Sequence, residues 1–110
     1  MRCGVVYFND SRAGVLAKFK SGVYEFRYLK EYRTREGACS ISATLPKSGG
    51  VYRSPHLFAF FHGLLAEGVQ KEHQCRMLKI DERDNFSRLL ATSSHGAAGA
   101  VCVKERMKGK

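Results

Sequence analysis

The sequence predicts an α+β domain in which a small antiparallel β-sheet carries about three helices packed on one side. Short β-branched and aromatic segments separated by turn residues fill the first half of the chain. A strongly apolar segment with helical spacing follows, and another short apolar segment closes the chain. At 110 residues, with 44% hydrophobic and 26% charged residues, the chain has the size and composition of one globular domain.

The first two strands are predicted near the N-terminus. Residues 3–8 (CGVVYF) are mostly β-branched and aromatic, and the sequence NDSRAG after them supplies turn residues. Residues 14–19 (GVLAKF) form the second short strand, which the sequence KSG ends. An antiparallel meander is therefore expected.

The third strand is predicted at residues 23–29 (VYEFRYL), which alternate with a period of two. The alternation places Tyr24, Phe26 and Tyr28 on one face of the strand. The favoured interpretation is that these rings belong to the core or to its rim. The charged sequence KEYRTRE that follows is expected to form a turn of helix before Gly37.

A fourth strand is expected at residues 39–46 (CSISATLP). Pro46 ends it, because proline has no N–H group to donate to a neighbouring strand. The Gly- and Ser-containing sequence KSGGVYRS, residues 47–54, is then expected to be a loop.

A buried helix is expected to follow this loop. Ser54 is a favourable N-cap, and Pro55 suits the first helical position, where its missing N–H costs nothing. Gly68 stands where a left-handed C-cap is expected. The apolar stripe comprises Leu57, Phe61, Leu64 and Leu65, widened by Phe58 and Phe60.

Two further helices and a last strand are expected in the C-terminal third. One helix runs from Val69 to about Leu78, and the other from about Arg83 to Ser94, with Asp84 as its cap. The inward-facing residues of the latter helix are Phe86, Leu89 and Leu90.

The last strand is predicted from Ala100 to Lys104. The chain thus divides into one domain, residues 1–104, and a short basic tail, residues 105–110.

The strongest bulk signal is the net charge of +9, from 19 Lys and Arg against 10 Asp and Glu. Such a charge attracts nucleic acid or an acidic protein surface. One hypothesis is therefore a basic nucleic-acid-binding module that stacks bases on an aromatic sheet face. Its phosphate-binding residues would be Arg27, Lys30, Arg33 and Arg35. If the rings belong to the core instead, the same residues form a solvated side.

The sequence carries little evidence of catalysis or metal binding. We find no P-loop, no H-E-x-x-H, no G-x-S-x-G and no dinucleotide-binding glycine pattern. The G-x-x-G at residues 96–99 encloses two alanines, so it is a weak signal for nucleic-acid binding. Four histidines lack metal-ligand spacing. We expect reduced and mostly buried thiols at Cys3, Cys39, Cys75 and Cys102.

No signal peptide or membrane span is expected. The apolar run at residues 4–8 is too short for a signal sequence, and no window approaches 18 apolar residues. A soluble cytoplasmic protein is the expectation.

Several segments together resemble a known family. In order, these are RAGVL, YEFRY, CSISATLP, FAFFHGLLAEG, NFSRLL and HGAAGAV. The series is similar to the N-terminal subdomain of bacterial HipA-type toxin kinases, whose pattern runs V-G-x-L, F-x-Y, L-S-x-S-L-P, F-F-x-x-L-L-P-[DE], F-x-L-L and G-A-V. The resemblance covers about residues 5–103.

The resemblance implies an interaction protein rather than an enzyme. The sequence has no kinase lysine context, no H-x-D-type catalytic loop and no D-F-G-like metal motif. A lone domain of this type resembles the HipS-like antitoxins of three-gene HipBST systems, a type II toxin–antitoxin system. The implied partners are a HipT-like Ser/Thr kinase, which the antitoxin inhibits, and a HipB-like helix-turn-helix protein, which binds DNA. DNA contact by the chain itself would be indirect or weak. No cofactor and no metal are implied.

The implied contact surface is the corner at the end of the apolar segment. The family usually carries proline where this chain has Ala66, and the chain contains no Trp, the commonest anchor residue of interfaces. A plugging side chain at this corner would be Val69 or a neighbour. The candidate partner-binding residues are Ala66, Glu67, Gly68, Val69, Gln70 and Lys71.

Overall fold

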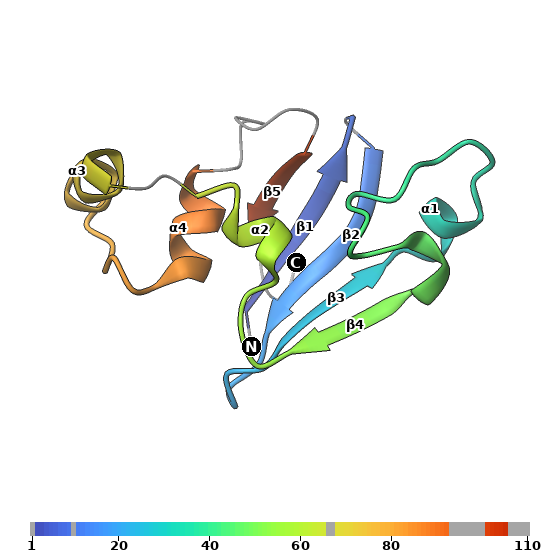
Figure 1. The fold of residues 1–110 in the computed structure, drawn as a ribbon, viewed down its shortest axis with the longest axis horizontal. Coiled ribbons are helices and arrows are strands. Elements are labelled where there is room, and N and C mark those ends of the chain that lie inside the picture. Colours follow the sequence, from blue (N-terminus) through green and yellow to red (C-terminus); the bar gives the residue numbers. More distant parts are fainter. Residues whose placement is uncertain (1, 10, 66–67, 93–100, 106–110) are drawn as a thin grey trace.

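The computed structural model describes residues 2–9, 11–65, 68–92 and 101–105. Within these residues it holds a five-stranded antiparallel sheet with the strand order β4-β3-β2-β1-β5 (Figure 1). The strands are β1 (Arg2–Phe8), β2 (Ser11–Lys18), β3 (Tyr24–Tyr28), β4 (Val51–Ser54) and β5 (Val101–Glu105). The helices are α1 (Lys30–Thr34), the 3-10 helix η1 (Lys47–Gly49), α2 (Ala59–His62), α3 (Gly68–Leu78) and α4 (Asn85–Thr92). The predicted α+β class is confirmed.

One face of the sheet forms the hydrophobic core. The side chains of Tyr24, Phe26 and Tyr28 alternate onto this face and are buried, which confirms the interpretation of these rings as core residues. Helix α2 adds Phe61, whose ring centroid lies 5.7 Å from that of Phe26. Helix α4 adds Phe86, at 6.1 Å from Tyr24.

Gly14 of β2 lets the ring of Phe26 lie directly against the sheet. A Cβ atom at Gly14 would lie 2.5 Å from the carbonyl oxygen of Arg27 and 2.7 Å from Cζ of Phe26. Both distances are far below van der Waals contact, and one neighbour is backbone that cannot turn away. Only glycine therefore fits at this position.

The prediction of a strand at residues 39–46 is wrong. Within this segment only an isolated bridge pairs Ser42 with Leu45, and the rest is turn or irregular. Ile41 and Leu45 are nevertheless buried, because the hydroxyl of Tyr28 accepts a hydrogen bond from the Ile41 N–H at 3.0 Å and donates one to the Leu45 carbonyl. Side-chain hydrogen bonds thus satisfy the backbone without a sheet neighbour.

The fourth strand in sequence is instead β4, which lies inside the segment expected to be a loop. It pairs antiparallel with β3, and Ser54 lies opposite Tyr24. Ser54 is thus the last residue of a strand, and its hydroxyl accepts a hydrogen bond from the His56 N–H at 3.1 Å. The expected role of Ser54 as a helix N-cap is therefore wrong.

The helix expected from Pro55 is much shorter than predicted. Helix α2 begins at Ala59 and ends at His62, and the N–H groups of Leu64 and Leu65 bond to carbonyls three residues back, as in a tight turn. Pro55 directly follows β4, and residues 55–58 are bend or irregular, so the helix does not begin there. The inward face was still predicted correctly in part, since Phe61 and Leu65 are buried.

The C-terminal elements agree closely with expectation. Helix α3 ends at Leu78 as predicted, and α4 is capped by Asp84, whose Oδ1 accepts the N–H of Ser87 at 3.1 Å. The three predicted core residues of α4 are all buried. Strand β5 runs from Val101 to Glu105, one residue beyond the predicted end of the strand. Residues 93–100, with the G-x-x-G sequence, and residues 106–110 lie outside the described residues.

The expectation of mostly buried thiols is wrong for this fold. Cys75 is buried, Cys3 and Cys102 are half-buried, and Cys39 is exposed. Cys3 and Cys102 lie on strands, with side chains on the sheet face that the helices leave uncovered, which explains their partial exposure. Among the described residues, no helix is long and apolar enough to cross a membrane.

We predict that Gly14→Ala destabilises the protein strongly. Overpacking of a filled core costs about 1–3 kcal/mol, and we expect at least about 2 kcal/mol here because the added methyl meets backbone. The matched control is Gly63→Ala, since Gly63 has φ −65° and a Cβ there would make only ordinary contacts of 3.4 Å or more. Chemical denaturation checks both variants. Equal stability of the two would contradict the packing argument.

The cap of α4 gives a second prediction, with a defined pH dependence. Burial raises the pKa of Asp84, but hydrogen bonds from the Ser87 hydroxyl and N–H, with the charges of Lys18 and Arg2, outweigh it and hold the pKa below its ordinary value of 3.8. We expect Asp84→Ala to lower the free energy of unfolding by about 1 kcal/mol at neutral pH. Because the folded-state pKa is lowered, this difference disappears as the pH falls through that value.

Denaturation curves of wild type and Asp84→Ala from about pH 7 down to about pH 2.5 measure this difference. Asp84→Asn is the control, since its amide oxygen keeps a capping acceptor but does not titrate. A pH-independent difference for Asp84→Ala would show that the carboxylate is not the capping group.

Candidate docking surface

Helix α3 extends away from the core. In Figure 1 it lies at the end of the molecule, with α4 between it and the sheet. Only Cys75 of its eleven residues is buried, and Lys71 and Gln74, on the same side of the helix, are half-buried. Most of the surface of α3 therefore faces solvent.

The outer side of α3 carries apolar residues. Among the described residues, four large hydrophobic side chains are exposed, and three of them belong to α3: Val69 at 80%, Met77 at 69% and Leu78 at 47%. Val69, His73 and Met77 recur every four residues, which places them along one side of the helix. Leu78 lies on the other side of the helix, with Lys71, Gln74 and Cys75. Single exposed apolar residues are ordinary, but Val69 and Met77 share one side, which makes this side of α3 a candidate docking surface. Our sequence interpretation missed Met77 and Leu78, although apolar residues on an otherwise polar helix are the signal that would have found them.

The C-terminal end of α3 is fixed by backbone hydrogen bonds. Lys79 has φ +58°, its N–H bonds to the Arg76 carbonyl at 3.4 Å, and the N–H of Ile80 bonds to the Cys75 carbonyl at 2.9 Å. This is a Schellman motif, with Lys79 in the position that glycine usually occupies. Asp81 then closes a turn by accepting the Arg83 N–H at 2.8 Å. Hydrogen bonds from Arg83 lower the pKa of Asp81.

The predicted partner-binding residues lie at the other end of α3. Gly68, Val69 and Gln70 are exposed and Lys71 is half-buried, while residues 66–67 (Ala66 and Glu67) lie outside the described residues. We call Gly68–Lys71 the α3 corner. Gly68 has the expected positive φ, +61°, but it begins α3 and does not cap the preceding helix, which ends at His62.

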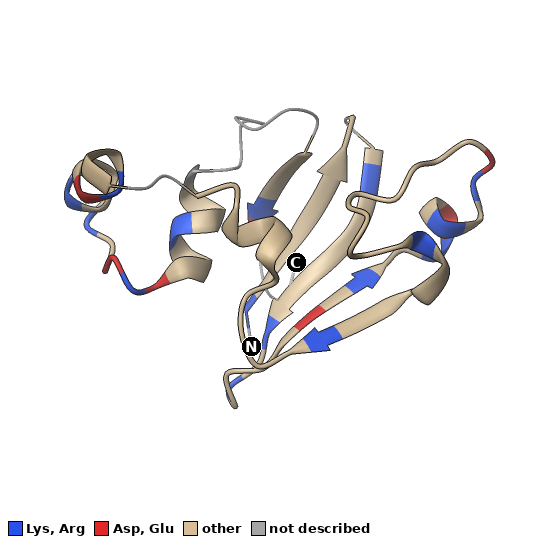
Figure 2. Cartoon of the chain, viewed as in Figure 1, with Lys and Arg blue, Asp and Glu red and all other residues tan. Residues whose placement is uncertain are grey.

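The candidate nucleic-acid residues are exposed but do not form one site. Arg27 belongs to β3, with its side chain on the face opposite the buried rings, whereas Lys30 and Arg33 lie on α1 and Arg35 directly follows it. Figure 2 shows basic residues on both elements. Arg35 is partly engaged, because its guanidinium lies 5.3 Å from the ring of Tyr32. These residues form the solvated side that the core interpretation predicts.

Base stacking on the sheet is not available to the predicted rings. Tyr24, Phe26 and Tyr28 are 7%, 0% and 3% exposed. They pack against Phe86 of α4, Phe61 of α2 and Tyr32 of α1, respectively. The idea of an aromatic sheet face for nucleic acid is therefore wrong, because the rings form the core.

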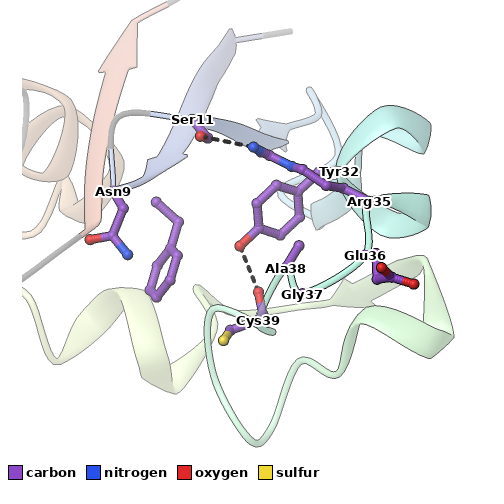
Figure 3. Close-up of a pocket in the computed structure, with 9 residues that line it drawn as sticks. Asn9, Ser11, Tyr32, Arg35, Glu36, Gly37, Ala38 and Cys39 are labelled. Carbon is purple, nitrogen blue, oxygen red and sulfur yellow. Dashed lines mark hydrogen bonds between the residues drawn. The ribbon is translucent and has the colours of Figure 1, made fainter.

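A hollow of about 260 Å³ opens between the β1–β2 turn and the loop after α1 (Figure 3). The Tyr32 hydroxyl donates a hydrogen bond to the Cys39 carbonyl at 2.6 Å, and Arg35 reaches Ser11 Oγ at 3.4 Å. Burial raises the pKa of Tyr32. Among the lining residues the thiol of Cys39 has no histidine beside it to act as a base, so the hollow does not have the arrangement of a nucleophilic active site.

The histidines that the structure describes do not form a metal centre with other described ligands. His56 and His62 line a second hollow together with Lys18 and Asn85, and no acidic or cysteine side chain lines it. Over the described ranges, no group of three His, Cys, Asp or Glu side chains could hold a metal ion.

Comparison with known proteins identifies the domain. The family model described as HipA N-terminal domain matches residues 5–104, nearly the whole chain. A solved structure described as "N-terminal domain of HipA toxin" matches with a TM-score of 0.71 and 24% identity, over 98% of this chain and 95% of that chain. This second likeness supports the fold. A search of curated proteins gave no match.

The family gives the fold a biological context. The similarity suggests a HipA-related toxin–antitoxin module, in which the HipA N-terminal domain is the non-catalytic subdomain. The match includes β2, β3 and β4, most of β1 and β5, and the α3 corner. The chain belongs to the HipA N-terminal domain family.

Proposed function

We propose that this chain is the antitoxin of a HipBST-like type II toxin–antitoxin system in the bacterial cytoplasm. It binds a HipT-like Ser/Thr kinase and inhibits it by contact, without catalysing a reaction itself. A HipB-like helix-turn-helix protein joins the complex and supplies the DNA contact. The family match supports this proposal, because it assigns the chain to the non-catalytic domain of the HipA type.

The observation that carries the proposal is the outward face of α3. A helix whose only task is to complete the domain would bury its apolar residues, yet α3 leaves Val69 and Met77 exposed on its outward face and buries only Cys75. Apolar anchors surrounded by a charged rim are the usual composition of an interface. Glu72 and Arg76, exposed beside the apolar residues, supply such a rim.

Electrostatics favours the same kind of partner. A net charge of +9 steers the chain toward an acidic surface and raises the rate of encounter. Because steering acts mainly on the association rate, we expect the apolar α3 corner to determine how long the complex lasts.

The first test is inhibition of a kinase. We expect the purified chain to lower autophosphorylation of a short HipT-like kinase encoded beside it, with inhibition saturating as the chain is titrated. Radiolabelled phosphate incorporation measures this, and size-exclusion chromatography measures the complex. No complex and no inhibition with the products of all adjacent genes would refute the proposed function.

The second test addresses the α3 corner. We expect Val69→Asp to weaken kinase binding and inhibition by about 30-fold, the usual effect of losing an interface anchor. Because Val69 is 80% exposed, the free energy of unfolding of the variant should lie within about 0.5 kcal/mol of the wild-type value. Ala43→Asp is the matched control, since Ala43 is an exposed apolar residue in the loop before η1 and the charge change is the same.

The two results separate the mechanism from the function. If wild type inhibits and Val69→Asp inhibits equally well, the chain is an antitoxin but the α3 corner is not its contact. If Ala43→Asp weakens inhibition as much as Val69→Asp, the effect is one of net charge.

A further inference from the structure

The described helices cover one face of the sheet and leave the other uncovered. Strand register defines this second face, which we call the open face. One row of paired residues runs across all five strands, from Lys104 through Val5, Val15 and Arg27 to Val51. The next row contains Ala17, Glu25 and Arg53, also paired in register. Tyr7 and Arg12, which pair with one another, also lie on this face.

The open face is strongly basic. Arg12, Arg27, Arg53 and Lys104 are exposed on it, and Glu25 is the acidic residue among them. Glu25 is only 7% exposed and is already paired, with Arg53 Nε at 2.8 Å and Arg27 Nη2 at 3.4 Å.

The cations nevertheless remain available to a partner. The side chains of Arg27 and Arg53 are 56% and 67% exposed although both contact Glu25. Each guanidinium has five N–H donors in a fixed plane, so one contact leaves others free to bind a carboxylate. Lys104 is exposed, with its Nζ 5.1 Å from the ring centroid of Tyr7.

An apolar strip runs between the cations. Val5 and Val15 are paired neighbours at the centre of the sheet and are half-buried without any helix above them. Lys104 lies on one side of the two valines and Arg27 on the other, three strand spacings apart, or about 14 Å between backbones. An α-helix with its side chains is about 10–12 Å wide, so a helix on the strip reaches both cations.

We propose that the open face is a docking surface for an acidic amphipathic helix of a partner protein. The apolar stripe of that helix lies on Val5 and Val15, and Asp or Glu residues on its two sides pair with Arg27 and Arg53 on one side and with Lys104 on the other. The partner helix then forms the second layer that a sheet with one uncovered apolar strip lacks.

The geometry favours this occupant over the alternatives. A nucleic-acid backbone would use the cations but would place phosphates over the two valines, where nothing compensates for their loss of hydration. A second copy of the chain would bring four cations against four cations, which repel. The proposal does not depend on kinase inhibition, because none of these residues lies on α3.

The test uses a synthetic probe. It is an α-helical peptide of about 18 residues with a leucine stripe at i, i+3, i+4 and i+7 and glutamate on both flanks. A peptide with the same composition and a scrambled order keeps the charge but loses the stripe. We expect titration of the ¹⁵N-labelled chain to shift amides of β1, β2, β3 and β5 and to leave α3 unshifted, with the scrambled peptide at least 10-fold weaker.

Variants of the open face separate its two components. We expect Lys104→Glu to weaken binding of the probe at least 10-fold and Val15→Thr, which keeps β-branching and size, about 5-fold. Arg76→Glu on α3 is the matched control for charge and should change affinity less than 2-fold. If Lys104→Glu unfolds the chain, Lys104→Gln replaces it, with an expected loss of at least 3-fold.

A 20-base-pair DNA duplex serves as the competing probe in about 150 mM salt. Equal affinity for the two peptides, equal effects of Lys104→Glu and Arg76→Glu, or shifts confined to other elements would each overturn the proposal. Displacement of the peptide by the duplex, with Val15→Thr having no effect, would overturn it in favour of nucleic acid.

Discussion

The fold depends on the close approach of the Phe26 ring to Gly14. With no Cβ at Gly14, the ring lies against β2 and leaves its outer surface for the helical layer. Tyr28 meets its edge at a centroid distance of 4.8 Å, and Phe61 of α2 packs at 5.7 Å. A side chain at position 14 would lift the ring, and the ring would displace α2. One missing methyl group therefore sets the distance between the sheet and the short helix that covers it.

The same aromatic cluster also holds a segment that has almost no regular structure. The rings of Tyr28 and Tyr32 stack with an angle of 6° between their planes. Their hydroxyls form hydrogen bonds with the backbone of residues 39–45. Lys47 contributes a further bond, from Nζ to the Ala38 carbonyl at 2.6 Å. Burial of the Tyr28 hydroxyl raises its pKa. The segment thus gains from side chains the hydrogen bonds that a strand would obtain from its neighbour.

The sequence predicts elements where local chemistry decides the outcome. Period-two alternation identified β3, and the acceptor oxygens of Asp84 identified the start of α4. Prediction from the sequence failed where groups distant in the chain determine the structure. Residues 39–46 have strand-forming composition, but the hydroxyl of Tyr28 forms hydrogen bonds with their backbone. Ser54 and Pro55 form a convincing helix start, but Ser54 is paired with Tyr24 across the sheet.

Of the two candidate surfaces, the α3 corner could be predicted from local sequence and the open face could not. Positive φ at Gly68 and exposure at Val69 follow from local signals, because a helix terminus favours glycine and a polar helix leaves an isolated valine uncovered. The open face could not be predicted, since its central row joins residues as distant in sequence as Val5 and Lys104. The basic charge of the open face was visible in the composition, but the arrangement of its basic residues around two valines depends on strand register.

Helix α3 combines exposure with a hydrogen-bonded connection to α4, and this combination bears on how it can act. Its C-terminal end is joined to α4 by the Schellman motif at Lys79, the turn at Asp81 and the cap at Asp84, so few backbone torsions between the two helices are free. Helix α4 is itself anchored in the core by Phe86 and Leu89. These hydrogen bonds restrict the backbone conformations of the connection, so they reduce the conformational entropy that α3 loses on binding a partner. Valine, which has one torsion and two methyl groups, suits such a restricted helix better than a long flexible side chain. The absence of tryptophan from the chain is thus compatible with an anchoring role for the α3 corner, because the restricted connection compensates for part of the area that the smaller side chain does not bury.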